Sequence, residues 1–119
     1  MRKILIADDE QGICLLLQEL LETNGYETVT VQTGKEALDA LKADSYALLI
    51  IDYKLPVLDG VEVLEQLNQE GSFTTPVIIM SGLVEQIDGR IKNMPFVKDV
   101  LAKPFNIGDL LSLIQAYVE

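Results

Sequence analysis

Histidine and tryptophan are absent from this 119-residue sequence, and cysteine occurs once, as Cys14. A single cysteine excludes an internal disulfide, and one thiol without any histidine cannot form a zinc site or a Cys-His pair. A reaction that needs a histidine acid, base or phosphoryl carrier has to take that group from a partner. Any histidine chemistry therefore belongs to another protein.

Basic residues and long apolar runs are also scarce. Nineteen acidic residues stand against nine basic ones, and the formal net charge is -10 at pH 7. This balance opposes binding to a phosphate backbone, so we expect no nucleic-acid partner. No run approaches the roughly 18 to 20 apolar residues of a membrane span, and no signal peptide precedes the first strand. We therefore expect no membrane contact and a cytoplasmic location.

Length and periodicity predict one α/β domain over residues 1–119. Hydrophobic residues make up 49% and charged residues 24% of the chain, which is typical of globular proteins. Short apolar or alternating runs predict strands at 3–7, 26–31, 47–52, 76–80 and 97–102, and the segments between and after them predict helices at 11–24, 33–43, 61–71, 84–92 and 106–118. This alternation predicts a flavodoxin-like fold, in which a five-stranded parallel sheet of order 2-1-3-4-5 is flanked by five helices.

Polar side chains stand at the ends of four predicted strands. Asp8 and Asp9 follow the first strand, and the third, fourth and fifth lead to Asp52, Ser81 and Lys103. Because the carboxyl ends of parallel strands meet at one edge of a sheet, we expect these side chains to converge. Each has a purely structural alternative, since aspartates begin turns or cap helices, serines begin loops and lysines face solvent. Their joint placement favours a functional site.

Three carboxylates at one sheet edge require a counter-charge. Each close pair costs about 4 kcal/mol at ~4 Å and an effective dielectric near ~20, which is large for a marginally stable domain. The Lys103 ammonium or a bound cation can supply the charge, and oxygen ligands select Mg²⁺, with Mn²⁺ as an alternative. An aspartate can also take a phosphoryl group as an acyl phosphate, whose oxygens Ser81 and Lys103 are suited to meet.

The sequence resembles the receiver domain of two-component response regulators over its full length. The motifs that carry the resemblance are Asp8-Asp9, Asp52, Pro56 to Gly60, Ser81-Gly82 and Lys103-Pro104-Phe105. The resemblance implies that Asp52 accepts a phosphoryl group from a histidine kinase or histidine phosphotransferase. It also implies that Mg²⁺ is bound by Asp9, Asp52 and the main-chain carbonyl of Lys54, and through water by Asp8. Ser81 and Lys103 would contact the phosphoryl oxygens.

Some features of the sequence bear on the subtype and on the output. Val100 stands where many receivers carry the tyrosine or phenylalanine of an aromatic switch, and Asn93 to Phe96 replaces a common Gly-Ala. Gly12-Ile13, Leu16-Leu17, Lys54 and Lys103 to Phe105 are similar to single-domain phosphorelay receivers of the sporulation type. We expect output through contact with a downstream protein or through onward phosphotransfer.

The predicted first helix suggests where a partner docks. If Ile13, Leu16, Leu17, Leu20 and Leu21 face the core, Cys14 and Leu15 lie at or near the surface beside the acidic site. They then form an apolar patch for a helical, histidine-bearing partner. The alternative is that they are scattered surface residues without a function.

Two other functions compete with the phosphoacceptor. One is a haloacid-dehalogenase-like phosphatase with Asp8 as nucleophile, although Glu10 stands where such enzymes carry a second aspartate. The other is a receiver-like binding module that is never phosphorylated. For the phosphoacceptor we expect no turnover of a separate substrate, only promotion of its own phosphorylation and dephosphorylation.

Overall fold

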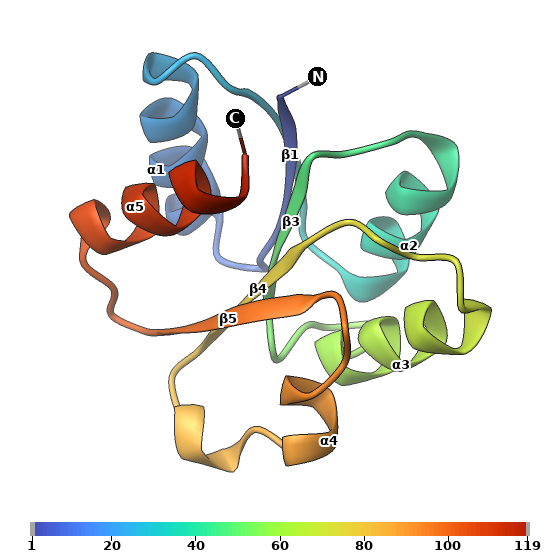
Figure 1. The fold of residues 1–119 in the computed structure, drawn as a ribbon. Coiled ribbons are helices and arrows are strands. Elements are labelled where there is room, and N and C mark those ends of the chain that lie inside the picture. Colours follow the sequence, from blue (N-terminus) through green and yellow to red (C-terminus); the bar gives the residue numbers. More distant parts are fainter. Residues whose placement is uncertain (1, 119) are drawn as a thin grey trace.

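The computed structural model describes residues 2–118 as alternating strands and helices around one parallel sheet (Figure 1). The strands are β1 (Lys3–Ala7), β2 (Glu27–Val31), β3 (Leu48–Asp52), β4 (Val77–Ser81) and β5 (Val97–Ala102). The helices are α1 (Gln11–Thr23), α2 (Gly34–Ala43), α3 (Gly60–Glu70), α4 (Gly89–Lys92) and α5 (Ile107–Tyr117), with a 3-10 turn, η1 (Val84–Gln86), before α4. The strand order β2-β1-β3-β4-β5 confirms the predicted sheet.

The sheet is covered on both faces. Figure 1 shows α1 and α5 on one face and α2, α3 and α4 on the other. Successive strand residues point to opposite faces, so Ile4 and Ile6 pack under α1 and α5 whereas Leu5 and Ala7 pack under α2 and α3. All residues of β3 and β4 are buried. Burial on both faces accounts for their continuous apolar sequences.

Helix ends follow local sequence signals. The Thr33 side chain accepts a hydrogen bond from the Glu36 amide at 3.1 Å and so caps α2. Asn106 caps α5 by accepting from the amides of Gly108 and Asp109. Gly71 ends α3 with a φ of 74°, a conformation that favours glycine. No helix within residues 2–118 is long and apolar enough to cross a membrane.

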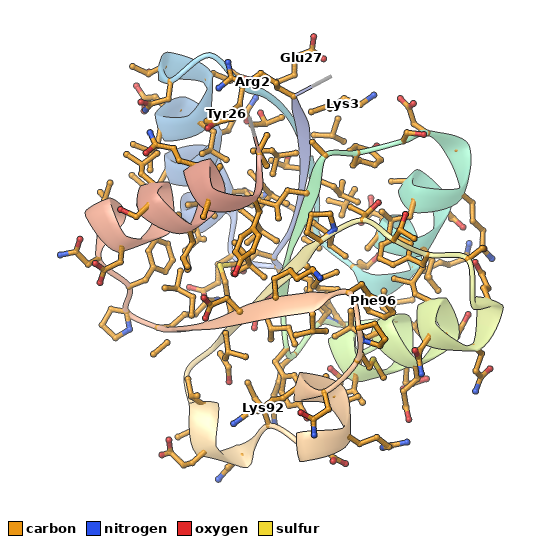
Figure 2. All side chains as sticks on the ribbon, viewed as in Figure 1. Arg2, Lys3, Tyr26, Glu27, Lys92 and Phe96 are labelled. Atoms are coloured by element: carbon orange, nitrogen blue, oxygen red, sulfur yellow. The ribbon has the colours of Figure 1, made fainter. Side chains whose placement is uncertain are left out.

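The segment before β5 differs from its prediction. Residues 84–92 do not form one helix, because Asp88 accepts from the Arg90 amide at 2.8 Å and starts the short α4 at Gly89. After α4 the chain is held by the Phe96 ring, which is labelled in Figure 2. This ring packs edge-on against Phe73 with centroids 5.1 Å apart. This contact fixes the chain between α4 and β5.

The apolar face of α1 is rotated from the predicted one. Cys14, Leu17 and Leu21 are buried, whereas Leu15 is 65% and Leu16 is 45% exposed. The prediction that Cys14 lies at the surface and Leu16 in the core is therefore wrong. Cys14 is small enough to pack against the end of β1, where its Sγ donates to the main-chain oxygen of Asp8 at 3.2 Å. Cys14 therefore cannot belong to a docking patch, and Leu16 takes its place at the surface.

Candidate functional site

The carboxyl edge of the sheet brings together the side chains that follow β1, β3 and β5. The Lys103 Nζ lies 2.7 Å from an Asp52 carboxylate oxygen, 2.8 Å from one of Asp8 and 3.4 Å from one of Glu10. Among residues 2–118, the only buried polar or charged residues are Asp8, Asp52 and Ser81. Since burying polar groups is costly unless they are paired, their concentration at one edge marks the site.

The main chain holds both buried carboxylates in place. Asp8 Oδ1 accepts from the Glu10 amide at 2.9 Å, and Asp52 Oδ1 accepts from the Lys54 amide at 3.3 Å. The chain then turns back so closely that a Cβ on Gly60 would lie 2.4 Å from the main-chain oxygen of Asp52. Only glycine allows this approach, and it fixes the β3–α3 loop against the end of β3.

Ser81 and Lys103 are linked through the ends of β4 and β5. The Lys103 amide donates to the Ser81 carbonyl at 2.8 Å, and the Ser81 hydroxyl oxygen accepts from the Leu83 amide at 3.1 Å. The peptide bond between Lys103 and Pro104 is cis. Both side chains line a pocket of about 330 Å³ that also contains Asp52, and we call it the polar pocket because most of its residues are charged or polar. A group bound to Asp52 would meet a hydroxyl and an ammonium there.

Glu10 joins the carboxylate cluster of the site whereas Asp9 does not, and the role of Asp9 as a metal ligand stays a prediction. Asp9 is exposed and lies outside the carboxylate cluster, which consists of oxygens from Asp8, Glu10 and Asp52 within 4.8 Å of one another. Sequence reasoning missed Glu10, although its position directly after Asp8-Asp9 is a signal that could have suggested it. Asp8 and Asp52 supply hard oxygen donors within the site, so the donor set fits Mg²⁺.

Electrostatic effects in the site oppose each other. Burial raises the pKa of the Asp52 carboxyl above its ordinary value, and Lys103 only partly offsets this effect. Burial alone would lower the pKa of Lys103, but its hydrogen bonds to Asp52 and Asp8 raise it above 10.5. The pKa values of both Asp52 and Lys103 are raised because Lys103 has several carboxylate partners, whereas Asp52 shares one ammonium with Asp8. The site therefore carries surplus negative charge.

A sequence model of the response regulator receiver domain matches residues 4–115. The chain belongs to this family. The receiver domain is a signalling domain of two-component systems, which agrees with the fold and with the acidic site at the sheet edge.

Individual relatives share the fold and part of the sequence. The alkaline phosphatase synthesis transcriptional regulatory protein PhoP of Bacillus subtilis is 34% identical over 97% of this chain and 48% of its own length. The chain spans about half the length of the curated relatives it matches. A Francisella response regulator receiver domain superposes with a TM-score of 0.88 at 32% identity, covering 98% of this chain and 96% of that one. The Thermotoga maritima regulator TrrA, solved with Mg²⁺-BeF, has a TM-score of 0.87 at 27% identity, covering 99% and 100%.

Proposed function

We propose that Asp52 accepts a phosphoryl group from a phosphohistidine on a histidine kinase or histidine phosphotransferase. An Asp52 carboxylate oxygen bonds to phosphorus as the phosphorus–nitrogen bond breaks, and the electron pair returns to the imidazole ring. The products are an acyl phosphate on Asp52 and an unphosphorylated histidine. The observation that carries this proposal is the buried Asp52 carboxylate at the end of β3, with the Lys103 Nζ at 2.7 Å.

Lys103 and Ser81 are the proposed contacts of the bound phosphoryl group. The Lys103 ammonium is already oriented by Asp8 and Asp52, and the Ser81 hydroxyl lines the same pocket. Transfer of this kind depends mainly on positioning and on neutralising the equatorial oxygens. We therefore assign Lys103 to charge neutralisation and Ser81 to a hydrogen bond on the group.

Mg²⁺ is the proposed metal, with Mn²⁺ as an alternative. The residues that would hold it are Asp8, Asp9, Asp52 and the main-chain carbonyl of Lys54. A bound divalent ion would offset the surplus carboxylate charge and the charge of the incoming phosphoryl group. TrrA, which shares this fold, was solved in complex with Mg²⁺-BeF, and this supports a metal in the present domain.

Phosphorylation by a small donor tests the proposal. Incubation with phosphoramidate and Mg²⁺ should increase the intact mass by one phosphoryl group, and Asp52→Asn should remove the increase. Asp39→Asn is a matched control because Asp39 is exposed on α2. Chelation of Mg²⁺ should slow the wild-type reaction strongly. Labelling that persists in Asp52→Asn would place the acceptor elsewhere.

An apolar pocket beside the site is the proposed docking position of the histidine-bearing partner. The pocket measures about 440 Å³ and its apolar lining consists of Ile13, Leu16, Pro104, Phe105 and Ile107. It takes the place of the patch predicted around Cys14. A helix that presents a phosphohistidine could pack here with the histidine facing Asp52.

Substitutions of two neighbouring residues of α1 distinguish this docking position from the one predicted from the sequence. Leu16 lines the apolar pocket, whereas Leu15 is more exposed and lies in a different hollow with Gln11 and Gln18. Leu16→Ser should slow transfer from a phosphorylated histidine phosphotransferase protein, and Leu15→Ser should not. Both variants should keep the wild-type rate with phosphoramidate. The reverse result would restore the patch predicted from the sequence.

A phosphatase with Asp8 as nucleophile is less well supported. Asp8 is fully buried and, unlike Asp52, does not line the polar pocket, so a separate substrate does not reach it. This environment is unsuited to a phosphatase nucleophile. We propose that residues 1–119 act as one receiver domain that also promotes its own phosphorylation and dephosphorylation.

The cellular location, the subtype and the output partners stay predictions. A cytoplasmic location, the sporulation-type subtype and output by protein contact or onward phosphotransfer belong to this group. The expected lack of a nucleic-acid partner applies to these residues alone, because PhoP is a transcriptional regulatory protein of about twice the length.

A further inference from the structure

Two hollows meet at the candidate site, and Glu10 lies on their border. The apolar pocket next to α1 and the polar pocket around Asp52 share two lining residues, Glu10 and Lys103. These two side chains are 3.4 Å apart at their charged groups. A donor that reaches Asp52 from the apolar side therefore passes the Glu10 carboxylate.

The main chain of Glu10 is fixed although its side chain is open to solvent. Its amide donates to Asp8 at 2.9 Å, and its carbonyl accepts from the amides of Ile13 and Cys14 at 3.1 Å each. The Glu10 side chain is nevertheless 62% exposed, compared with 15% for Lys103 and none for Asp8. The hydrogen-bonded main chain of Glu10 thus holds its carboxylate at the mouth of the polar pocket.

We propose that Glu10 determines donor specificity by repelling phosphoryl donors of high negative charge, an inference that rests on the proposed role of Asp52. Its carboxylate lies within 4.8 Å of the Asp52 oxygen that belongs to the same cluster, so a phosphoryl group approaching Asp52 comes close to it. Repulsion at this distance grows with the charge of the donor. In a solvent-exposed site, each unit of donor charge changes the rate by about threefold to fivefold.

Two small donors of different charge give the same product on Asp52. Acetyl phosphate is largely a dianion at neutral pH, and its phosphorus–oxygen bond breaks as acetate leaves with the electron pair. Phosphoramidate is largely a monoanion whose nitrogen already carries the extra proton, and its phosphorus–nitrogen bond breaks as ammonia leaves with the electron pair. The ratio of the two phosphorylation rates therefore reports the charge dependence and cancels effects common to both reactions.

The test compares Glu10→Gln with wild type at saturating Mg²⁺, using initial rates from intact mass. We expect the acetyl phosphate to phosphoramidate rate ratio to increase by about threefold to fivefold in Glu10→Gln. Added salt should narrow the difference between the two proteins because it screens the carboxylate. Glu70→Gln makes the same change in net charge at the far end of α3 and should leave the ratio unchanged.

The outcomes separate this inference from the function on which it rests. An unchanged ratio in Glu10→Gln, with wild type still labelled on Asp52, would overturn the specificity role alone. A fall in both rates would also overturn it, because Glu10 would then be needed to hold the metal or Lys103. Wild-type protein that takes no label from either donor would overturn the proposed function together with this inference.

Discussion

Charged side chains are paired at the amino end of the sheet, whereas carboxylates are in excess at its carboxyl end. At the amino end, Lys3 pairs with Asp44 and Arg2 lies over the Tyr26 ring, 4.4 Å from its centroid (Figure 2). At the carboxyl end, the single Lys103 ammonium contacts the carboxylates of three residues. Charge is balanced where the sheet is only structural and unbalanced where it carries the candidate site. Surplus negative charge disfavours folding but prepares a site for a cation.

Backbone strain is found at the same carboxyl end. In the β3–α3 loop, Val57 has a φ of 69°, and the Leu58 amide donates to the Pro56 carbonyl at 2.8 Å across it. A β-branched residue seldom adopts this conformation. The comparison predicts that removing charge or strain at the carboxyl end stabilises the fold, whereas removing packing or the shared counter-charge destabilises it.

The largest expected effect concerns the packing of the β3–α3 loop. A Cβ on Gly34 would lie 1.7 Å from the main-chain oxygen of Leu58, so Gly34→Ala should force the loop away from α2. We expect a loss of about 3 kcal/mol in the free energy of unfolding, measured by urea denaturation. Gly12→Ala on α1 is the control, because nothing lies within 4 Å of its Cβ. Equal losses in the two variants would contradict this account of the loop.

Removal of the shared counter-charge is the next largest change. Lys103→Met leaves the buried Asp8 without its cation and should cost about 2 to 3 kcal/mol at pH 7. The pKa of Lys103 is raised above 10.5 on folding, so its contribution is complete below pH 10.5 and is lost as pH rises through the folded value. The difference from wild type should therefore disappear only in strongly alkaline solution. A difference that vanishes near neutral pH would contradict this assignment.

Removal of one carboxylate should stabilise the protein. Folding raises the pKa of Asp52 above 3.8, so the ionised form opposes folding, and Asp52→Asn should stabilise the protein at pH 7 by less than Lys103→Met destabilises it. The gain should be absent below pH 3.8 and appear as pH rises through the folded pKa. At the amino end, Asp44→Asn should have the opposite sign, since Lys3 lowers the pKa of Asp44. Denaturation midpoints measured across pH give the stability change of each variant. Changes of the same sign in Asp52→Asn and Asp44→Asn would contradict the contrast between the two ends.

The smallest expected effect comes from the strained loop residue. Val57→Gly relieves the left-handed conformation but increases the freedom of the unfolded chain, so the net gain should be about 0.5 kcal/mol. Val57→Ala is the control, because alanine keeps the unfavourable φ without the branched side chain. A loss of stability in the glycine variant would show that Val57 is not strained.

The fold and the site's position followed from sequence because their signals are local. The apolar runs ending at Ala7, Asp52 and Ser81 fix three strands and their polar ends, and α/β topology then places those ends together. The cap at Thr33 depends only on residues within one turn of the helix. Interactions of this short range can be predicted without knowledge of the packing.

The face of α1 and the positions of Asp9 and Glu10 relative to the site could not be predicted in this way. Residues 13–17 are all apolar, so periodicity allows several rotations of the helix, and packing of Cys14 against β1 selects one. Asp8 and Asp9 are adjacent and chemically identical, yet only Asp8 is buried in the site. Glu10 acquires its position through Lys103, which is 93 residues away in sequence.

Chemical trapping of the acyl phosphate tests the central claim most directly. Borohydride reduces an aspartyl phosphate to homoserine, which peptide mass spectrometry locates in the chain. After reaction with phosphoramidate and Mg²⁺, we expect homoserine at position 52 and none there when the donor is omitted. Homoserine at position 8 or 9, or a phosphorylated protein without homoserine at any aspartate, would contradict the assignment of Asp52 as the phosphoacceptor.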